Sequence, residues 1–382
     1  MTDEELHGPL LNQQGSRASL NTPVLVIDLD ALTRNIAAMA QFAAQKGLKL
    51  RPHAKTHKSA DIARLQIEAG ALGVCCAKIG EAEAMAENGV LQGLHITSPV
   101  VSPPAIARLI ALNARTEGLM CVVDNPANVQ ALGAAARAAG GKPLTVIIDI
   151  DPGIRRTGVG SPEAAVAVLE AIRAEAGLTY AGVQCYCGSQ QHIEGYDARL
   201  EAMQGRAAFV RTVIAALTAA GGAPQIVTGG GTGTHRIDPT LDLFTELQVG
   251  SYVFMDAQYL ACDLTGDGEP VPFETALMID ARVVSANTPG LVTLDAGFKA
   301  FATDAEAPLV LSGAPEGAKY RFMGDEHGAL LLPDGGILPL SHVVTLGAPH
   351  CDPTVNLYDT YHVVQGDTLR ALWPVAARGR SR

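Results

Sequence analysis

A repeated alternation of short apolar strands and alanine-rich helices over the first two-thirds of the chain constrains its fold most strongly. Val- and Ile-rich runs, such as VLVIDL at 24–29 and PLTVIIDID at 143–151, are followed by stretches with helical periodicity. Strands that are apolar on both faces and separated by single helices are typical of parallel βαβ units. We count nine such strands before residue 256. Since a (β/α)8 barrel needs eight strands, we expect strand 24–29 to be surplus and to pair with a second domain.

The pattern of residue types changes after about residue 265. The runs there are strand-like and punctuated by Gly, Pro, Asn and Asp, and helical periodicity disappears. We therefore predict an α/β protein, with a (β/α)8 TIM-type barrel followed by an antiparallel β domain. The expected division is an N-terminal arm at 1–21, the barrel at 22–265 and the β domain at 266–382.

Composition excludes several classes of protein. Hydrophobic residues make up 48% of the 382 residues, which is typical of a large packed core. The net charge of −11 argues against a general nucleic-acid binder, because phosphate contacts need clustered cations. No run approaches the roughly 18 apolar residues of a membrane span, and the acidic first residues do not resemble a secretory signal. Seven cysteines without regular spacing favour a reducing cytoplasm and no disulfides.

A cluster of cations follows an early strand in LRPHAKTHKS at 50–59. Catalytic groups of a barrel lie at the carboxyl ends of its strands, and Lys55 falls near such an end. A nucleophilic lysine must be neutral, and the surrounding cations (Arg51, His53, His57 and Lys58) would lower its pKa. A basic strand end that faces solvent explains the same residues, so the stretch alone leaves both interpretations open.

Two further stretches follow strands of the predicted barrel. VTGGGTGT at 227–234 offers backbone N–H groups and hydroxyls to an anion, and VGSYVFMD at 249–256 offers a second Gly-Ser pair. DIDPGIRRTGVG at 149–160 places two arginines at a strand end, where a guanidinium can meet a phenolate or carboxylate. Ordinary turns would account for each stretch. Together, a reactive lysine, an anion cup and an arginine on one rim match the needs of pyridoxal phosphate.

The sequence also resembles a known family. The resemblance covers residues 22 to 378 and is carried in order by TPVLVIDLDAL, RPHAKTHK, GVCCAKIGEAEAM, VDNPANV, GGGTGT, ELQVGSYVFMD, LDAGFKA, DEHG and HCDPTVNLYD. These motifs resemble the D-threonine aldolase and D-serine dehydratase branch of the alanine-racemase-like (fold type III) pyridoxal-phosphate enzymes. The resemblance implies a barrel, a C-terminal β domain and a homodimer.

Site residues follow from the resemblance by motif. It implies that Lys55 is the Schiff-base lysine, that Arg156 faces the ring oxygen and that Tyr186 lies beside the cofactor ring. The phosphate would be held by residues of 228–232 and 250–252, namely Thr228, Gly230, Gly231, Thr232, Gly250, Ser251 and Tyr252. Cys187-Gly188 stands where the family has His-Gly or Ser-Gly after this tyrosine, so the lining of the substrate pocket is expected to differ.

His350 and Asp352 in PHCDPT form a candidate metal pair. In an extended segment they would point the same way, with Cys351 opposite. One imidazole and one carboxylate leave coordination positions open, as in catalytic sites. The motif is weak alone, but the resemblance places a metal pair here. The dehydratase members carry cysteine at the second position, whereas aspartate is typical of the aldolases and favours Mn²⁺ or Mg²⁺, with Zn²⁺ and Co²⁺ as alternatives.

The predicted reaction is cleavage of a D-3-hydroxyamino acid, such as D-threonine, to glycine and an aldehyde. A metal lowers the pKa of the β-hydroxyl, a base removes its proton, and the cofactor accepts the electrons. The base is metal-bound hydroxide or a histidine. His192 is our candidate, although the sequence is equally consistent with a surface histidine that has no role in catalysis. Asp325 and Glu326 are candidates for orienting the metal ligands, and a hairpin turn explains them equally.

Several alternatives share parts of this site. A 3-hydroxy-D-aspartate aldolase would release glycine and glyoxylate, and a metal-dependent D-serine or D-hydroxyaspartate dehydratase would release ammonia and a keto acid. A non-catalytic pyridoxal-phosphate carrier would lack the β domain. A sugar-phosphate barrel enzyme would use the glycine-rich cup without this cofactor.

Overall fold

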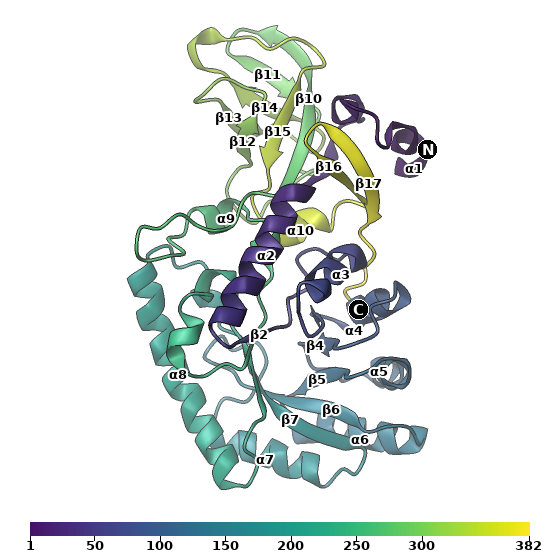
Figure 1. Cartoon of the computed structure of the whole chain (residues 1–382), viewed down its shortest axis with the longest axis vertical. Coiled ribbons are helices and arrows are strands. Elements are labelled where there is room, and N and C mark those ends of the chain that lie inside the picture. The colour runs from purple at the N-terminus through teal and green to yellow at the C-terminus, as the bar shows by residue number, and fades with distance from the viewer.

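The computed structural model describes residues 1–382. An α/β unit and a second unit made mainly of strands lie one above the other (Figure 1). One hydrophobic cluster of 86 buried residues draws on both units, so they are packed together through a continuous core.

The α/β unit is built around a parallel sheet of eight strands in the order β2-β9-β8-β7-β6-β5-β4-β3. These strands are β2 (Lys49–Leu50), β3 (Cys75–Cys76), β4 (His95–Ile96), β5 (Met120–Val123), β6 (Leu144–Asp149), β7 (Leu178–Cys185), β8 (Ile226–Gly229) and β9 (Glu246–Leu247). A parallel bridge between His53 and Cys75 joins the two edges of the sheet. The sheet is therefore the predicted (β/α)8 barrel.

Helices connect the strands around the outside of the barrel (Figure 1). They are α2 (Leu29–Gln45), α3 (Ala60–Glu68), α4 (Ile79–Glu87), α5 (Pro103–Arg115), α6 (Pro126–Ala139), α7 (Pro162–Arg173) and α8 (Tyr196–Ala219). Capping residues and prolines determine where several of these helices begin. The Asp28 carboxylate accepts from the backbone N–H of Ala31 at 3.0 Å. Helices α5, α6 and α7 begin with proline, whose fixed φ suits the first helical turn.

The second unit is a nine-stranded sheet, and it includes the first strand of the chain. Its strands are β1 (Val24–Asp28), β10 (Leu277–Thr288), β11 (Leu291–Leu294), β12 (Leu309–Ser312), β13 (Lys319–Phe322), β14 (Gly328–Leu331), β15 (Val343–Gly347), β16 (Thr360–Gln365) and β17 (Thr368–Pro374). Strand β1 pairs antiparallel with β10 and parallel with β16, so the sheet is antiparallel except at that one pair. The surplus strand of the sequence thus lies outside the barrel and links the two units.

Short helices complete the chain. They are α1 (Asp3–His7), α9 (Ala257–Leu260), α10 (Cys351–Val355) and the 3-10 helices η1 (Gly8–Leu10), η2 (Ser16–Ser19), η3 (Gly188–Gln190), η4 (Thr232–Thr234), η5 (Asp238–Leu241), η6 (Ser251–Val253) and η7 (Pro333–Gly335). The N-terminal arm lies beside β16 and β17 (Figure 1), where the backbone N–H of Asn12 donates to the carbonyl of Leu369 at 2.8 Å. No helix is both long and apolar enough to cross a bilayer. All seven cysteines are buried and free.

Candidate active site

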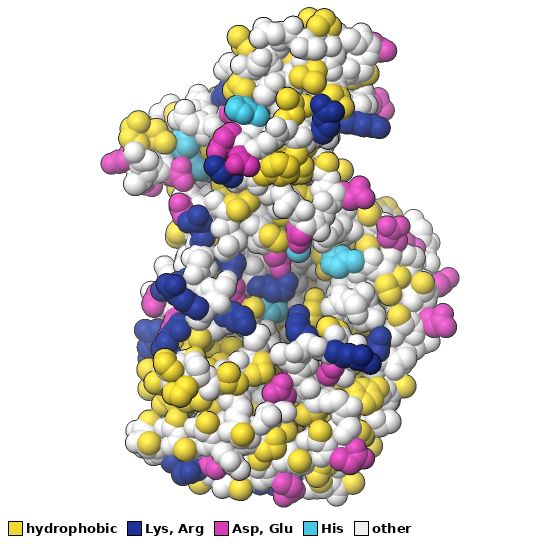
Figure 2. Space-filling view, turned by 180° about the vertical axis from the view of Figure 1, so that it is seen from behind, with side chains coloured by type: hydrophobic (Ala, Val, Ile, Leu, Met, Phe, Trp, Pro, Cys, Tyr) yellow, Lys and Arg dark blue, Asp and Glu magenta, His cyan; other side chains and the backbone are white.

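A cavity of about 480 Å³ lies at the carboxyl ends of the barrel strands, next to the second sheet. Viewed from behind, cationic and histidine side chains gather around a hollow at mid-height of the molecule (Figure 2). The lining residues are His53, Lys55, Ala77, Lys78, Thr97, Ser98, Arg156, Gln184, Tyr186, Gly188, His192, Gln248 and His350. Five of the residues predicted from sequence thus share one cavity, and no Asp or Glu is among those that line it.

Lys55 follows β2 at the rim of the barrel, and its Nζ forms an ion pair with Oδ2 of Asp352 from the second unit. Burial alone would lower the pKa of Lys55, but the negative charge of Asp352 outweighs burial and raises the pKa above its ordinary value. The expectation of a lowered pKa was therefore wrong for the chain as it stands. The cause is a carboxylate from a distant segment.

The cations around Lys55 are also compensated or neutral. Arg51 donates to the buried carboxylate of Glu246 at 2.9 and 3.2 Å, and Lys58 forms a buried ion pair with Glu81. Burial lowers the pKa of His57 to about 4, so that its imidazole is neutral at pH 7. The predicted field of uncompensated positive charge is absent, because acids from other strands and helices pair with these cations.

His53 positions the reactive loop through its two ring nitrogens. Its Nδ1 accepts the backbone N–H of Lys55 at 3.3 Å, which leaves the proton on Nε2. Nε2 then donates to the hydroxyl of Thr97 at 3.1 Å. Burial lowers the pKa of His53 well below its ordinary value, so this arrangement holds a neutral ring. His53 therefore fixes the backbone from which Lys55 projects.

His350 and Asp352 are close together, but not in the predicted extended segment. His350 is the extended residue before α10, and Asp352 lies in the first turn of that helix. Cys351 is fully buried between them, and its backbone N–H donates to Asp256 at 2.8 Å. The start of the helix brings the pair to the cavity, whereas the sequence had suggested strand alternation.

The residues of this pair fit a divalent cation. Nδ1 of His350 is hydrogen-bonded to the carboxylate of Asp304 at 2.8 Å, which leaves Nε2 available. Oδ1 of Asp352 is buried and has no hydrogen-bond partner. Burial alone would raise the pKa of Asp352, but the ammonium of Lys55 outweighs it and lowers the pKa to about 2. A charged oxygen and an imidazole nitrogen are donors that Mn²⁺, Mg²⁺ or Zn²⁺ can use.

The partner of His350 was not predicted. Asp325 and Glu326 were the candidates, yet Glu326 forms an exposed ion pair with Lys299. Asp304 takes the place next to His350 instead. It lies in the loop FATDAEAP, where nothing in the local pattern distinguishes it from any surface acid.

The glycine-rich stretches after β8 and β9 form one cradle. The backbone N–H of Tyr252 donates to the hydroxyl of Thr232 at 2.9 Å and so joins the two stretches. A Cβ on Gly250 would lie 2.6 Å from Oγ1 of Thr56, and a Cβ on Gly231 would lie 2.5 Å from Oε1 of Gln191. The Thr56 hydroxyl is buried without a hydrogen-bond partner. These close approaches favour glycine at positions 231 and 250, and the cradle fits a phosphate group.

The side chains of two predicted cradle residues are engaged in hydrogen bonds with glutamines. Thr228 is fully buried, and its hydroxyl accepts from Nε2 of Gln248 at 3.0 Å. The phenol of Tyr252 accepts from Nε2 of Gln66 at 3.1 Å. The backbone N–H of Tyr252 contacts Thr232, whereas its phenol is bound elsewhere; Gly231 and Gly250 are the residues that precede η4 and η6.

Arg156, Tyr186 and His192 occupy another wall of the cavity. The guanidinium of Arg156 lies 5.8 Å from the centre of the Tyr186 ring and forms no ion pair. The ring of His192 lies 4.6 Å from that of Tyr259. Burial is the main cause that lowers the pKa of His192, and the positive charges of His350 and Lys55 lower it further. The cavity thus holds a free cation and a neutral base.

Comparisons with known proteins agree with this geometry. Residues 27–258 match the family model of the alanine racemase N-terminal domain, and residues 276–364 match that of the putative serine dehydratase domain. A 3-hydroxy-D-aspartate aldolase from Paracoccus denitrificans (strain Pd 1222) is 38% identical over 367 residues, which cover 95% of this chain and 93% of that protein. A D-threonine aldolase from Arthrobacter sp is 37% identical over 366 residues, which cover 96% and 94%.

A solved structure extends the similarity to three dimensions. The crystal structure of D-threonine aldolase from Filomicrobium marinum matches with a TM-score of 0.90 and 36% identity, over 96% of this chain and 97% of that one. The chain therefore belongs to the alanine racemase N-terminal domain family, in the branch that also carries the putative serine dehydratase domain.

Proposed function

We propose that this protein is a lyase that uses pyridoxal 5′-phosphate and a divalent cation to cleave D-3-hydroxyamino acids into glycine and an aldehyde. The observation that carries the proposal is the contact between Lys55 and Asp352, beside His350 in the same cavity. A reactive amine and a candidate metal ligand from two different units meet there. The similarity to two aldolases along nearly the whole chain supports the same reaction.

Each part of the cofactor has a candidate partner. Lys55 would hold it covalently, the cradle of Gly230–Thr232 and Gly250–Tyr252 would hold its phosphate, and Arg156 would face its ring oxygen. Tyr186 would lie along the ring, and Thr228 would support the cradle from below. When bound, pyridoxal phosphate supplies an electron sink for the pair of electrons released at Cα.

His350 and Asp352 would hold the cation, which lowers the pKa of the substrate hydroxyl. We favour Mn²⁺ or Mg²⁺ because the carboxylate is a hard ligand. Asp352 has Lys55 as its counter-charge in this structure. A cation on Asp352 would take over that role and release the amine of Lys55. Metal loading and lysine reactivity would then support each other.

His192 is the candidate base that accepts the hydroxyl proton. It lines the cavity, and its lowered pKa keeps the ring neutral and able to accept a proton at pH 7. Arg156 has no acidic partner, so its charge is available to orient a negative ligand.

One purified sample tests the proposal. We expect an absorbance band near about 410–430 nm that borohydride removes, and D-threonine should yield glycine and acetaldehyde. Lys55→Ala should lose both the band and the activity. A colourless protein, or products that are ammonia and a keto acid, would overturn the proposal, and the second result would indicate a dehydratase.

A 3-hydroxy-D-aspartate aldolase is the second candidate within the same reaction. The observation that favours it is the cationic lining of the cavity: no Asp or Glu is among the lining residues, and Asp352, which meets Lys55 there, is already paired with it. Cleavage would then release glycine and glyoxylate. Comparison of kcat/KM for 3-hydroxy-D-aspartate and D-threonine separates the two candidates.

We also propose a homodimer in the cytoplasm, with domains at 22–265 and 266–382 after an arm at 1–21; strand β1 of the first domain is added to the sheet of the second. Seven free cysteines suit a reducing compartment. Exposed apolar side chains on the second unit, including Phe298 and Met323, support a covered face there. Light scattering of the purified protein checks the dimer, and a monomer would contradict it.

A further inference from the structure

Lys78 is a cation at the edge of the active-site cavity that has no acidic partner. It follows β3 and immediately precedes α4. The nearest acid along the chain, Glu81, is already engaged: one oxygen pairs with Lys58, and the other accepts the backbone N–H of Ala77 at 2.7 Å. Lys78 itself forms no ion pair and is exposed. Its charge is therefore available to a ligand.

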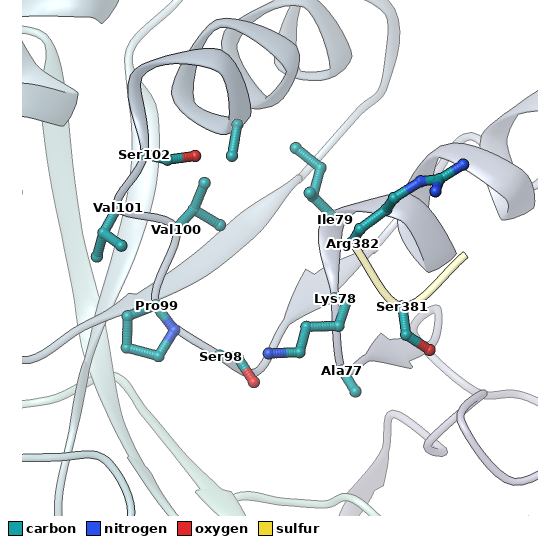
Figure 3. Close-up of a pocket in the computed structure, with 11 residues that line it drawn as sticks. Ala77, Lys78, Ile79, Ser98, Pro99, Val100, Val101, Ser102, Ser381 and Arg382 are labelled. Atoms are coloured by element: carbon teal, nitrogen blue, oxygen red, sulfur yellow. The ribbon is translucent and has the colours of Figure 1, made fainter. Parts of the chain in front are cut away.

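The position of Lys78 links two pockets. It lines the active-site cavity and also a neighbouring pocket of about 190 Å³, and Ala77 and Ser98 are shared in the same way. In Figure 3 the side chain of Lys78 reaches across the gap between α4 and the segment after β4, toward Ser98. Lys78 thus belongs to the boundary that the cavity shares with the second pocket.

The other cations of the cavity have their own tasks. Lys55 is paired with Asp352, and Arg156 lies over Tyr186. If Lys55 becomes covalently linked and Arg156 faces the cofactor, neither charge remains for the far end of a substrate. Lys78 is the remaining lysine or arginine that lines the cavity, and no Asp or Glu is among the lining residues; Asp352, which meets Lys55 there, is assigned to the cation.

We propose that Lys78 binds the side-chain carboxylate of the substrate and makes this enzyme selective for 3-hydroxy-D-aspartate over D-threonine. This inference rests on the proposed function. The α-carboxylate is attached next to the amine that replaces Lys55, whereas the side-chain carboxylate lies on the far side of the bond to be cleaved. Lys78, at the boundary with the second pocket, suits the second position.

Kinetics of Lys78→Gln test this specificity. A hydrogen bond to a charged group corresponds to roughly 10–100-fold in binding. We expect kcat/KM for 3-hydroxy-D-aspartate to fall by about that factor, mainly through KM, while that for D-threonine changes less than about threefold. Lys78→Arg should retain part of the preference. Lys46→Gln is the matched control, since Lys46 is exposed at the end of α2 and should change neither value.

Binding of unreactive analogues gives a second readout. D-aspartate and D-2-aminobutyrate lack the hydroxyl needed for cleavage, and their dissociation constants can be titrated through the cofactor absorbance of the holoenzyme. Lys78→Gln should weaken only D-aspartate. If the affinity for both analogues falls equally, Lys78 binds the α-carboxylate that they share. If neither affinity falls, Lys78 does not contact the ligand. Either result overturns this inference. If the wild type cleaves neither 3-hydroxy-D-aspartate nor D-threonine, the proposed function itself is overturned.

Discussion

The ion pair of Lys55 and Asp352 sets the electrostatics of the cavity, because each residue holds the other in its charged form. A half-buried ion pair of this kind is favourable only while both charges remain. The pair therefore couples cation binding at Asp352 to cofactor binding at Lys55. A ligand that binds Asp352 removes the counter-charge of Lys55 and so lowers its pKa. Unmatched charge would be costly at this position, which favours loading of cofactor and cation together.

Asp304 determines how well His350 can serve as a ligand. Its carboxylate holds Nδ1 at 2.8 Å and so directs Nε2 away from it. Loss of such a partner typically weakens metal binding by about 10–100-fold. We expect Asp304→Ala to raise the Mn²⁺ dissociation constant of the holoenzyme by that factor, measured by calorimetry. Glu326→Gln is the control, since that acid pairs with Lys299. Equal constants for the two variants would show that Asp304 has no such role.

At the scale of elements, the cradle depends on two short 3-10 helices, η4 and η6, and on the glycines before them. A Cβ on Gly250 would press on Thr56 Oγ1 at 2.6 Å. Overpacking of this kind costs about 1–3 kcal/mol. Gly250→Ala should therefore weaken cofactor binding on the order of tenfold or more, measured by absorbance after dialysis. Gly205→Ala on α8, where a Cβ meets nothing within 4 Å, should leave the affinity unchanged. Full retention in Gly250→Ala would argue against the cradle.

Asp238 in η5 contacts the same cradle through Thr234 of η4. Burial raises its pKa to about 8, and its carboxyl accepts from the hydroxyl of Thr234 at 2.8 Å. Because the folded protein holds this proton between pH 3.8 and about 8 while the unfolded chain releases it, stability falls as pH rises through that range. From pH 6 to 8, wild type should lose roughly 2 kcal/mol more than Asp238→Asn. Urea unfolding at both pH values measures the difference, and parallel pH slopes would contradict it.

Helices and strands that depend on interactions between residues close in sequence could be predicted better than those that depend on distant residues. The barrel strands depend on local apolar runs that the sequence displays directly: the run at 143–151 contains β6, Leu144–Asp149. The pairing of strand 24–29 with the second domain was expected from the strand count alone, whereas its partners β10 and β16 were not predicted. The geometry of His350 and Asp352 was predicted wrongly, because a helix start in a five-residue element leaves no periodic signal.

At the scale of the whole molecule, the site exists only because two units meet over one core. Lys55 and Asp352 are 297 positions apart, so their contact could not be predicted from spacing. The acids that neutralise Arg51 and Lys58 likewise come from other strands and helices. Motifs predicted five of the thirteen residues that line the cavity as site residues. They did not predict the charge state of these residues, because that depends on partners brought by tertiary packing.

One measurement tests the central claim, that a lysine-bound cofactor and a cation on Asp352 act on the same substrate. The Asp352→Ala holoenzyme is incubated with D-threonine and Mn²⁺, and its absorbance and glycine production are recorded in the same sample. We predict that the band near about 410–430 nm is retained while glycine formation falls at least about 1000-fold. Glycine formation at the wild-type rate in this variant would contradict the account.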